Sequence, residues 1–192
     1  MPIQNLAPGT TLKFPLSLKF QCKNPAGNGE VSSGAEPIAV TIVDGSTTAE
    51  QIDFVPHAPG GINYIQSDGD VLSGMFTGCV MSAYQVAGKR RVAHVHTGTD
   101  AGADRCNKAT MKALLNGASH RPLVSFKPYE DADNTKYVDI CMKTALGPKG
   151  CAVFGLVTAD QSCYAIFTQA MGTHEYKIVH VVDKSAQNYQ FG

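Results

Sequence analysis

The chain has 192 residues, and its 16 basic residues equal its 16 acidic residues in number. This balance gives no electrostatic basis for nucleic acid or an anionic membrane as the main partner. Charged residues make up only 17% of the chain, and the 19 Gly and 10 Pro indicate many turns, as in strand-rich proteins. The length predicts a single domain over residues 1–192.

Strand signals begin close to the N-terminus. Apolar and polar residues alternate strictly over residues 10–22, which predicts a half-buried strand with Pro15 at an edge or a bulge. The β-branched run at residues 38–43 predicts a more buried strand. Residues 46–72 are weakly patterned, and we expect only a short strand there, at residues 62–66.

The stretch from residue 73 to residue 98 predicts a hairpin with a Gly-containing turn. A two- or four-residue loop sets Cys79 opposite Gly98, whereas a five-residue loop sets it opposite His96. In either register, Cys79 and His96 are direct or diagonal neighbours across the two strands, with about 5 to 8 Å between their Cβ atoms. His94 lies on the same face, one step further away.

The rest of the chain predicts one helix and further strands. The helix is expected over residues 104–116, and its predicted inward stripe consists of Cys106, Ala109, Thr110, Ala113 and Leu114. The expected strands lie at residues 123–126, 137–143, 151–158, 163–169 and 175–183. Short strands with little strand–helix alternation favour an α+β fold, with a β-sandwich-like core of mostly antiparallel strands flanked by one or two helices.

Six cysteines show no zinc-finger spacing, which makes a structural zinc site improbable. Five of them sit in apolar runs and are expected to be buried, whereas Cys79 is framed by Gly78 and a turn. His94 and His96 would fit half of a metal site, but no third ligand is indicated by spacing, so neither a metal nor a cofactor is expected. No apolar run is long enough to cross a membrane, and no N-terminal signal peptide is recognised.

The candidate chemistry is that of an activated thiol. An imidazole can favour the thiolate of Cys79, and His96 is the preferred base, with His94 as the alternative. The hydroxyl of Ser73 can orient the histidine or contact substrate, and backbone N–H groups near Thr77 and Gly78 can stabilise an oxyanion. The residues alone leave open a non-catalytic β-sandwich binding module in which the cysteine is only packed.

The motif around the cysteine resembles a known enzyme family. The turn at residues 77–79, the following strand and the return strand with its histidines are similar to those of the cysteine-dependent glutamine deamidases. These include the catalytic domain of cytotoxic necrotizing factor, the Burkholderia lethal factor and the chemoreceptor glutamine deamidase CheD. Ser73 falls where the lethal factor has a catalytic threonine. The helix start at residues 102–106 and the strand at 154–158 are similar too, whereas Phe76 stands where the family has leucine.

The resemblance implies a CNF/CheD-like deamidase fold and a single catalytic domain acting as a monomer. It implies a bacterial toxin or effector, a hydrolase that converts a glutamine of a host protein to glutamate through a thioester on Cys79. A Rho-type GTPase or a translation factor is the expected substrate. Alternatives on the same Cys–His pair are a transglutaminase and a protease. We expect secretion by a specialised route or delivery into the host cytoplasm.

Overall fold

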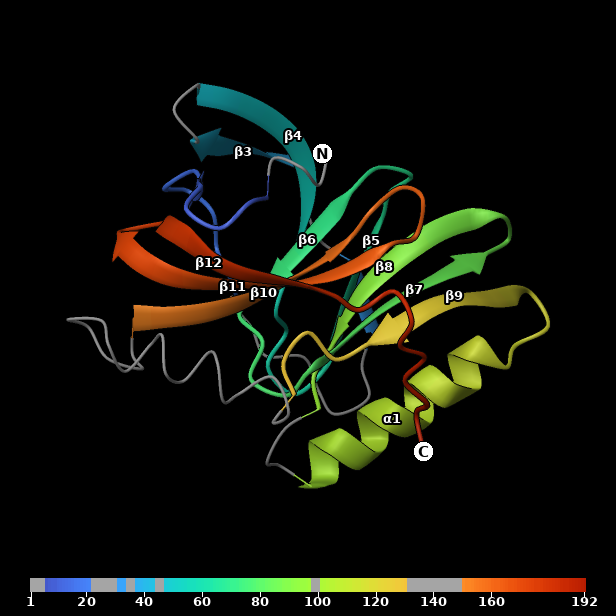
Figure 1. Ribbon diagram of the computed structural model, residues 1–192. Coiled ribbons are helices and arrows are strands. Elements are labelled where there is room, and N and C mark those ends of the chain that lie inside the picture. The colour runs from blue at the N-terminus through green and yellow to red at the C-terminus, as the bar shows by residue number, and fades with distance from the viewer. Residues whose placement is uncertain (1–5, 22–30, 34–36, 44–46, 98–100, 131–149) are drawn as a thin grey trace.

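In the computed structural model, the described residues form two sheets of strands with one helix beside them (Figure 1). The strands are mostly antiparallel, which confirms the predicted α+β class. The structure describes residues 6–21, 31–33, 37–43, 47–97, 101–130 and 150–192. No helix in these ranges is long and apolar enough to cross a membrane.

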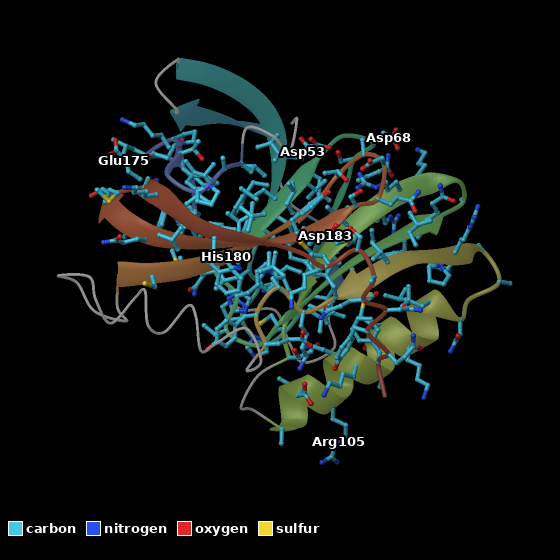
Figure 2. The ribbon with its side chains drawn as sticks, in the orientation of Figure 1. Asp53, Asp68, Arg105, Glu175, His180 and Asp183 are labelled. Carbon is cyan, nitrogen blue, oxygen red and sulfur yellow. The ribbon has the colours of Figure 1, made fainter. Side chains whose placement is uncertain are left out.

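The first sheet closes on itself as a barrel. Its strands, in spatial order, are β1 (Thr11–Lys13), β12 (Glu175–Asp183), β11 (Cys163–Gly172), β10 (Cys151–Val157), β6 (Val71–Gly74), β4 (Thr47–Pro56) and β3 (Pro37–Val43). All neighbours are antiparallel except β4 and β6, which run parallel. Glu175 and Asp183 mark the two ends of β12 in Figure 2.

The second sheet has five strands and packs between the barrel and the helix. Its order is β2 (Val31–Ser33), β5 (Ile62–Gln66), β8 (Lys89–Val95), β7 (Val80–Val86) and β9 (His120–Phe126), and the helix is α1 (Ala101–Leu115). One apolar cluster fills the barrel, a second lies between barrel and sheet, and a third lies between the sheet and α1. The arrangement is therefore layered, as expected for a sandwich, with one layer closed into a barrel.

The central hairpin has a two-residue turn. Ala87 and Gly88 both have positive φ, +50° and +79°, which is the backbone of a type I′ turn. Val80 pairs with Val95, so the next pair outward sets Cys79 opposite His96. The sequence predicted this register for a five-residue loop. The structure reaches it with a two-residue turn, which lies one residue earlier than the two-residue turn that would set Cys79 opposite Gly98.

The predicted N-terminal strand over residues 10–22 is wrong beyond β1, which has three residues. After Pro15, which has no N–H to donate, the chain turns, and the amide of Leu18 donates to the Pro15 carbonyl. Leu16 is consequently 74% exposed. The alternation of apolar and polar residues after Pro15 therefore does not mark a strand, because a turn brings Leu18 back to the core.

Two strands in residues 46–72 were not predicted. Phe54 packs inside the barrel while its neighbour Val55 packs between barrel and sheet, so both faces of this end of β4 are buried. All four residues of β6 are buried as well. Strands buried on both faces lack the alternation that identifies a strand in a sequence. The short strand expected at residues 62–66 is confirmed as β5.

The helix is confirmed, but its buried face differs from the predicted stripe. It begins at Ala101, and its buried residues are Ala103, Asn107 and Met111. The Asn107 amide donates to the carbonyl oxygens of His96 (2.8 Å) and Gly60 (3.1 Å), which fixes the helix rotation. The predicted inward Cys106 is therefore exposed. Its neighbour Arg105 points away from the sheet (Figure 2).

The C-terminal strands expected at residues 151–158, 163–169 and 175–183 are confirmed as β10, β11 and β12, and the strand at 123–126 as the end of β9. The strand expected at residues 137–143 lies outside the described residues. The cysteines differ in part from the expectation that the five other than Cys79 are buried, because Cys106 is exposed. Cys79 and Cys163 are buried free thiols, whereas Cys151 is in a disulfide.

Arg90 ties the hairpin to the barrel from a buried position on β8. Its guanidinium donates to the carbonyl oxygens of Ser67 (3.0 Å), Gly69 (2.6 Å) and Thr158 (2.8 Å). Only 5% of the residue is exposed, and burial lowers the pKa of the guanidinium. The charge is thus held by three backbone acceptors, two in the loop after β5 and one after β10.

We expect Arg90→Ala to lower the free energy of unfolding by about 3 to 5 kcal/mol, because three backbone carbonyl groups lose a charged donor. Denaturant unfolding followed by circular dichroism measures this change. Lys89→Ala, at the exposed neighbouring position, is the matched control and should change stability by less than about 0.5 kcal/mol. Equal effects of the two substitutions would contradict a structural role for the guanidinium.

Candidate active site

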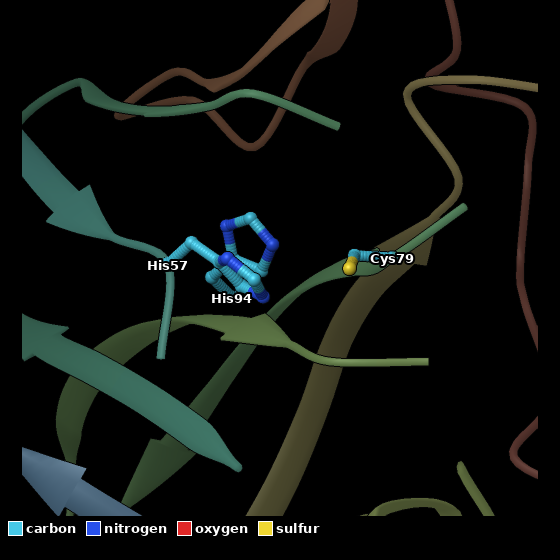
Figure 3. A group of neighbouring side chains, drawn as sticks. All are labelled: His57, Cys79 and His94. Carbon is cyan, nitrogen blue, oxygen red and sulfur yellow. The ribbon is translucent and has the colours of Figure 1, made fainter. Parts of the chain in front are cut away.

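The candidate site lies where the barrel meets the five-stranded sheet. In the parallel pair β4 and β6, Val55 is opposite Ser73 and Pro56 is opposite Gly74, so His57 follows directly at this edge. The hairpin brings Cys79 and the end of β8 to the same place. Figure 3 shows His57, Cys79 and His94 arriving there from three separate segments. Sequence-distant side chains are therefore assembled by strand register.

Ser73 and His94 form the best-defined contact of the site. The Ser73 hydroxyl donates its single hydrogen to the carbonyl of Val55 at 2.6 Å, and its Oγ lies 2.8 Å from Nδ1 of His94. Since that hydrogen is already used, Oγ accepts from His94, and Nδ1 carries the proton. In the neutral ring, Nε2 is then a lone-pair acceptor. Ser73 thus orients His94, and not the preferred base His96.

The imidazole of His94 is enclosed on both faces. The Phe76 ring stacks on it with 4.2 Å between ring centroids and 7° between planes, and the His57 ring lies at 4.8 Å. His94 is fully buried, and its Nε2 has no hydrogen-bond partner among the described residues. Burial, followed by the neighbouring His57 and His96, lowers the pKa of His94 well below 6.5. His94 is therefore a neutral base with an unused lone pair.

Cys79 lies close to three imidazoles. Its Sγ is 4.0 Å from Nδ1 of His96, and ligating atoms of Cys79, His57 and His94 all lie within 4.8 Å of one another. Only 5% of Cys79 is exposed, and burial raises the pKa of its thiol. The backbone N–H of Thr97, the charge of Lys127 and the residue's own N–H act in the opposite direction. The thiol is therefore protonated at rest and needs a base to ionise it.

His57 and His96 form a second pair of imidazoles. Nε2 of His57 lies 2.9 Å from Nδ1 of His96, so one ring donates and the other accepts. Burial, with a smaller effect from His96, lowers the pKa of His57 to about 4. The amide of His96 donates to Gly61 and its carbonyl accepts from Asn107, so the loop before β5 and the helix both hold this histidine.

The turn before the cysteine is anchored, with Thr77 exposed at its surface. Gly78 has a φ of +145°, a conformation that L side chains rarely adopt, and its carbonyl accepts from the Thr97 hydroxyl at 2.7 Å. One backbone donor of this segment is already used, because the amide of Phe76 donates to Val153. The candidates for an oxyanion site are therefore the amides that follow, at Thr77, Gly78 and Cys79.

His57 is the site residue that the sequence analysis missed. It follows β4, a strand that was not predicted, and lies 22 residues before Cys79 in the chain. No local motif connects it to the hairpin. The pairing of Val55 with Ser73 brings it to the site, and that pairing has no signal in a single sequence.

Comparisons of this chain with protein-family models, curated proteins and solved structures find no match. Its functional interpretation therefore depends on the residues and their geometry.

We expect stability to depend on pH through His94. The unfolded chain protonates this residue near pH 6.5, whereas the folded protein keeps it neutral to much lower pH. Its contribution is therefore complete above about pH 6.5 and is lost as the pH falls, at up to about 1.4 kcal/mol per pH unit. Denaturant unfolding between about pH 7 and pH 5 measures this slope.

In His94→Gln the slope of stability against pH should decrease by up to about 1.4 kcal/mol per pH unit, the equivalent of one proton. An unchanged slope in His94→Gln would show that His94 is protonated in the folded protein, contrary to its buried, neutral setting.

Proposed function

We propose that this chain is a cysteine-dependent protein-glutamine deamidase. Cys79 is the nucleophile, His94 the general base, and Ser73 the residue that positions His94. The carrying observation is the hydrogen bond from His94 Nδ1 to Ser73, which leaves Nε2 of His94 unprotonated in a group of side chains whose ligating atoms, Sγ of Cys79 included, lie within 4.8 Å of one another. A nucleophile, a base and a third group that orients the base are the parts of a catalytic triad.

The proposed reaction proceeds in two steps. The thiol of Cys79 gives its proton to Nε2 of His94 while sulfur attacks the side-chain carbonyl carbon of a glutamine. The tetrahedral intermediate collapses, His94 returns the proton to the departing ammonia, and a thioester remains. Water then attacks the thioester with His94 as base, and glutamate and the free thiol are released.

The raised pKa of Cys79 and the lowered pKa of His94 fit this order of events. Both groups are neutral at rest, so the proton moves during attack and no ion pair is formed beforehand. The assignment of His94 as base replaces the preference for His96, because Ser73 contacts His94. His96 remains the imidazole nearest to the sulfur in a hydrogen-bond geometry, at 4.0 Å.

The resemblance to the glutamine deamidases extends the proposal to substrate and setting. We propose that the substrate is a host protein, of the Rho-type GTPase or translation-factor class, and that the chain acts as a toxin or effector. The substrate would approach over the turn before the cysteine, where Met75 is 40% exposed and Thr77 is exposed as well.

A non-catalytic binding module is the second candidate, and one observation favours it. Only 5% of Cys79 is exposed, as for a cysteine packed in a core. In that case, the thiol would have no effect on any substrate. Substitutions at Cys79 and His94 distinguish a deamidase from a binding module.

We expect the wild-type protein, incubated with a host-cell lysate, to raise the mass of specific glutamine peptides by about 1 Da, as quantified by mass spectrometry. Cys79→Ala should abolish this change. Cys163→Ser, at a buried free thiol on β11, is the matched control and should retain it. Fragmentation of the substrate would instead indicate a protease, and amine incorporation a transglutaminase.

The two candidate bases should differ in the same assay. His94→Gln should slow the initial rate by about 100-fold or more, because a general base contributes that much. His96→Gln should keep most of the rate, and Ser73→Ala should slow it while Ser73→Thr restores it. Full activity in His94→Gln would exclude His94 as base, and full activity in Cys79→Ala would exclude every enzymatic version of the proposal.

A further inference from the structure

We propose that His57, Cys79 and His94 form a binding site for Zn²⁺. The three residues come from the end of β4, the start of the hairpin and β8, and their ligating atoms lie within 4.8 Å of one another. Two imidazoles and one thiolate are donors that zinc prefers. Among the described residues, this group of three side chains, drawn in Figure 3, contains no carboxylate.

The spacing is close to that of a zinc-bound set. With Zn–N near 2.0 to 2.1 Å and Zn–S near 2.3 Å, tetrahedral ligand atoms lie about 3.4 to 3.6 Å apart. Pairs at the 4.8 Å limit must therefore approach by about 1.2 Å. His94 is fixed within β8, so the approach falls to His57, which is half-buried, follows a strand end and must shift while its Nε2 is paired with Nδ1 of His96 at 2.9 Å.

A second observation, independent of the spacing, points to a ligand. Nε2 of His94 is fully buried and has no partner among the described residues. An unpaired buried acceptor is costly, and a native protein needs a reason for it. The other nitrogen, Nδ1, donates to Ser73, as the second nitrogen of metal-binding histidines donates to an oxygen. The ring is thus held in the tautomer that presents Nε2 to a cation.

The donor set also determines which cations should bind. Mg²⁺ and Ca²⁺ require oxygen ligands, which the three residues do not offer. Zn²⁺ accepts imidazole and thiolate together and keeps a fourth position for water in open sites. A 2-His, 1-Cys set is therefore selective for Zn²⁺ and its spectroscopic substitute Co²⁺ over the alkaline-earth cations.

Binding would have one consequence for the proposed deamidase, and only this consequence rests on the proposed function. The metal would occupy Sγ of Cys79 and Nε2 of His94, the two atoms that the reaction uses. Zn²⁺ would consequently inhibit deamidation, and a chelator would restore it. The binding itself requires no catalytic role of these residues.

The direct test is titration of chelator-treated protein with Co²⁺, followed by optical spectroscopy. Thiol reductants are left out, because Cys151 is in a disulfide. We expect one Co²⁺ per chain, visible bands of a tetrahedral ion and a near-ultraviolet thiolate-to-cobalt charge-transfer band, all displaced by Zn²⁺. Mg²⁺ should displace none of them. Absence of these bands would overturn the proposal.

Variants identify the ligands, with far-ultraviolet circular dichroism as the check on folding. Cys79→Ser should remove the charge-transfer band, and His57→Gln and His94→Gln should each weaken Co²⁺ binding by more than about 100-fold, because loss of a ligand costs more than loss of its hydrogen-bond partner. Ser73→Ala should weaken it by about 10- to 100-fold, since it loses only the support of His94.

Matched controls come from residues outside the group. Cys106→Ser removes the exposed free thiol on α1, and His120→Gln removes a histidine on β9. Both should bind Co²⁺ as the wild type does. A spectrum that persists in Cys79→Ser, or disappears in Cys106→Ser, would place the metal elsewhere and overturn the proposal.

The two proposals fail separately. Metal-free protein that deamidates substrate but binds no Co²⁺ would overturn the zinc site alone. Protein that binds one Co²⁺ through Cys79 but deamidates nothing when metal-free would overturn the deamidase and leave the zinc site intact.

Discussion

The hydrogen bond between Ser73 and His94 connects the two sheets at the point where the candidate site forms. Ser73 belongs to the barrel and His94 to the five-stranded sheet. The bond is constrained from the barrel side, because the Ser73 hydroxyl gives its hydrogen to Val55 on the paired strand at 2.6 Å. The tautomer of His94 follows from this, and with it the free lone pair on which both the proposed base and the proposed zinc ligand depend.

The side chains packed around His94 favour the neutral form of its ring, in which Nε2 keeps its lone pair. Phe76 and His57 cover the faces of the ring and exclude water, so the neutral imidazole is favoured. Burial of Cys79 itself raises the pKa of its thiol. Two neutral, nearly buried groups that can exchange a proton are suited to a nucleophile with a base, and also to a soft cation.

Much of the hairpin and of the C-terminal third could be predicted from the sequence, because alternation and β-branched runs identify strands with one polar face. The register that sets Cys79 opposite His96 was one of the two alternatives that the turn allowed. Strand β6 and the C-terminal end of β4 escaped prediction, since both of their faces are buried there. The rotation of α1 was also missed, because a polar residue, Asn107, is among the three buried residues of the helix.

The site itself was predictable only in part. Cys79, His94 and His96 lie in one hairpin, whereas His57 reaches them through a parallel strand pair that leaves no local pattern.

The central claim concerns one proton, that on Nδ1 of His94. Long-range ¹H–¹⁵N NMR correlation of the imidazole at neutral pH tests it directly. The account predicts a protonated Nδ1 and an unprotonated Nε2 in metal-free protein, and a proton on Nε2 would contradict it.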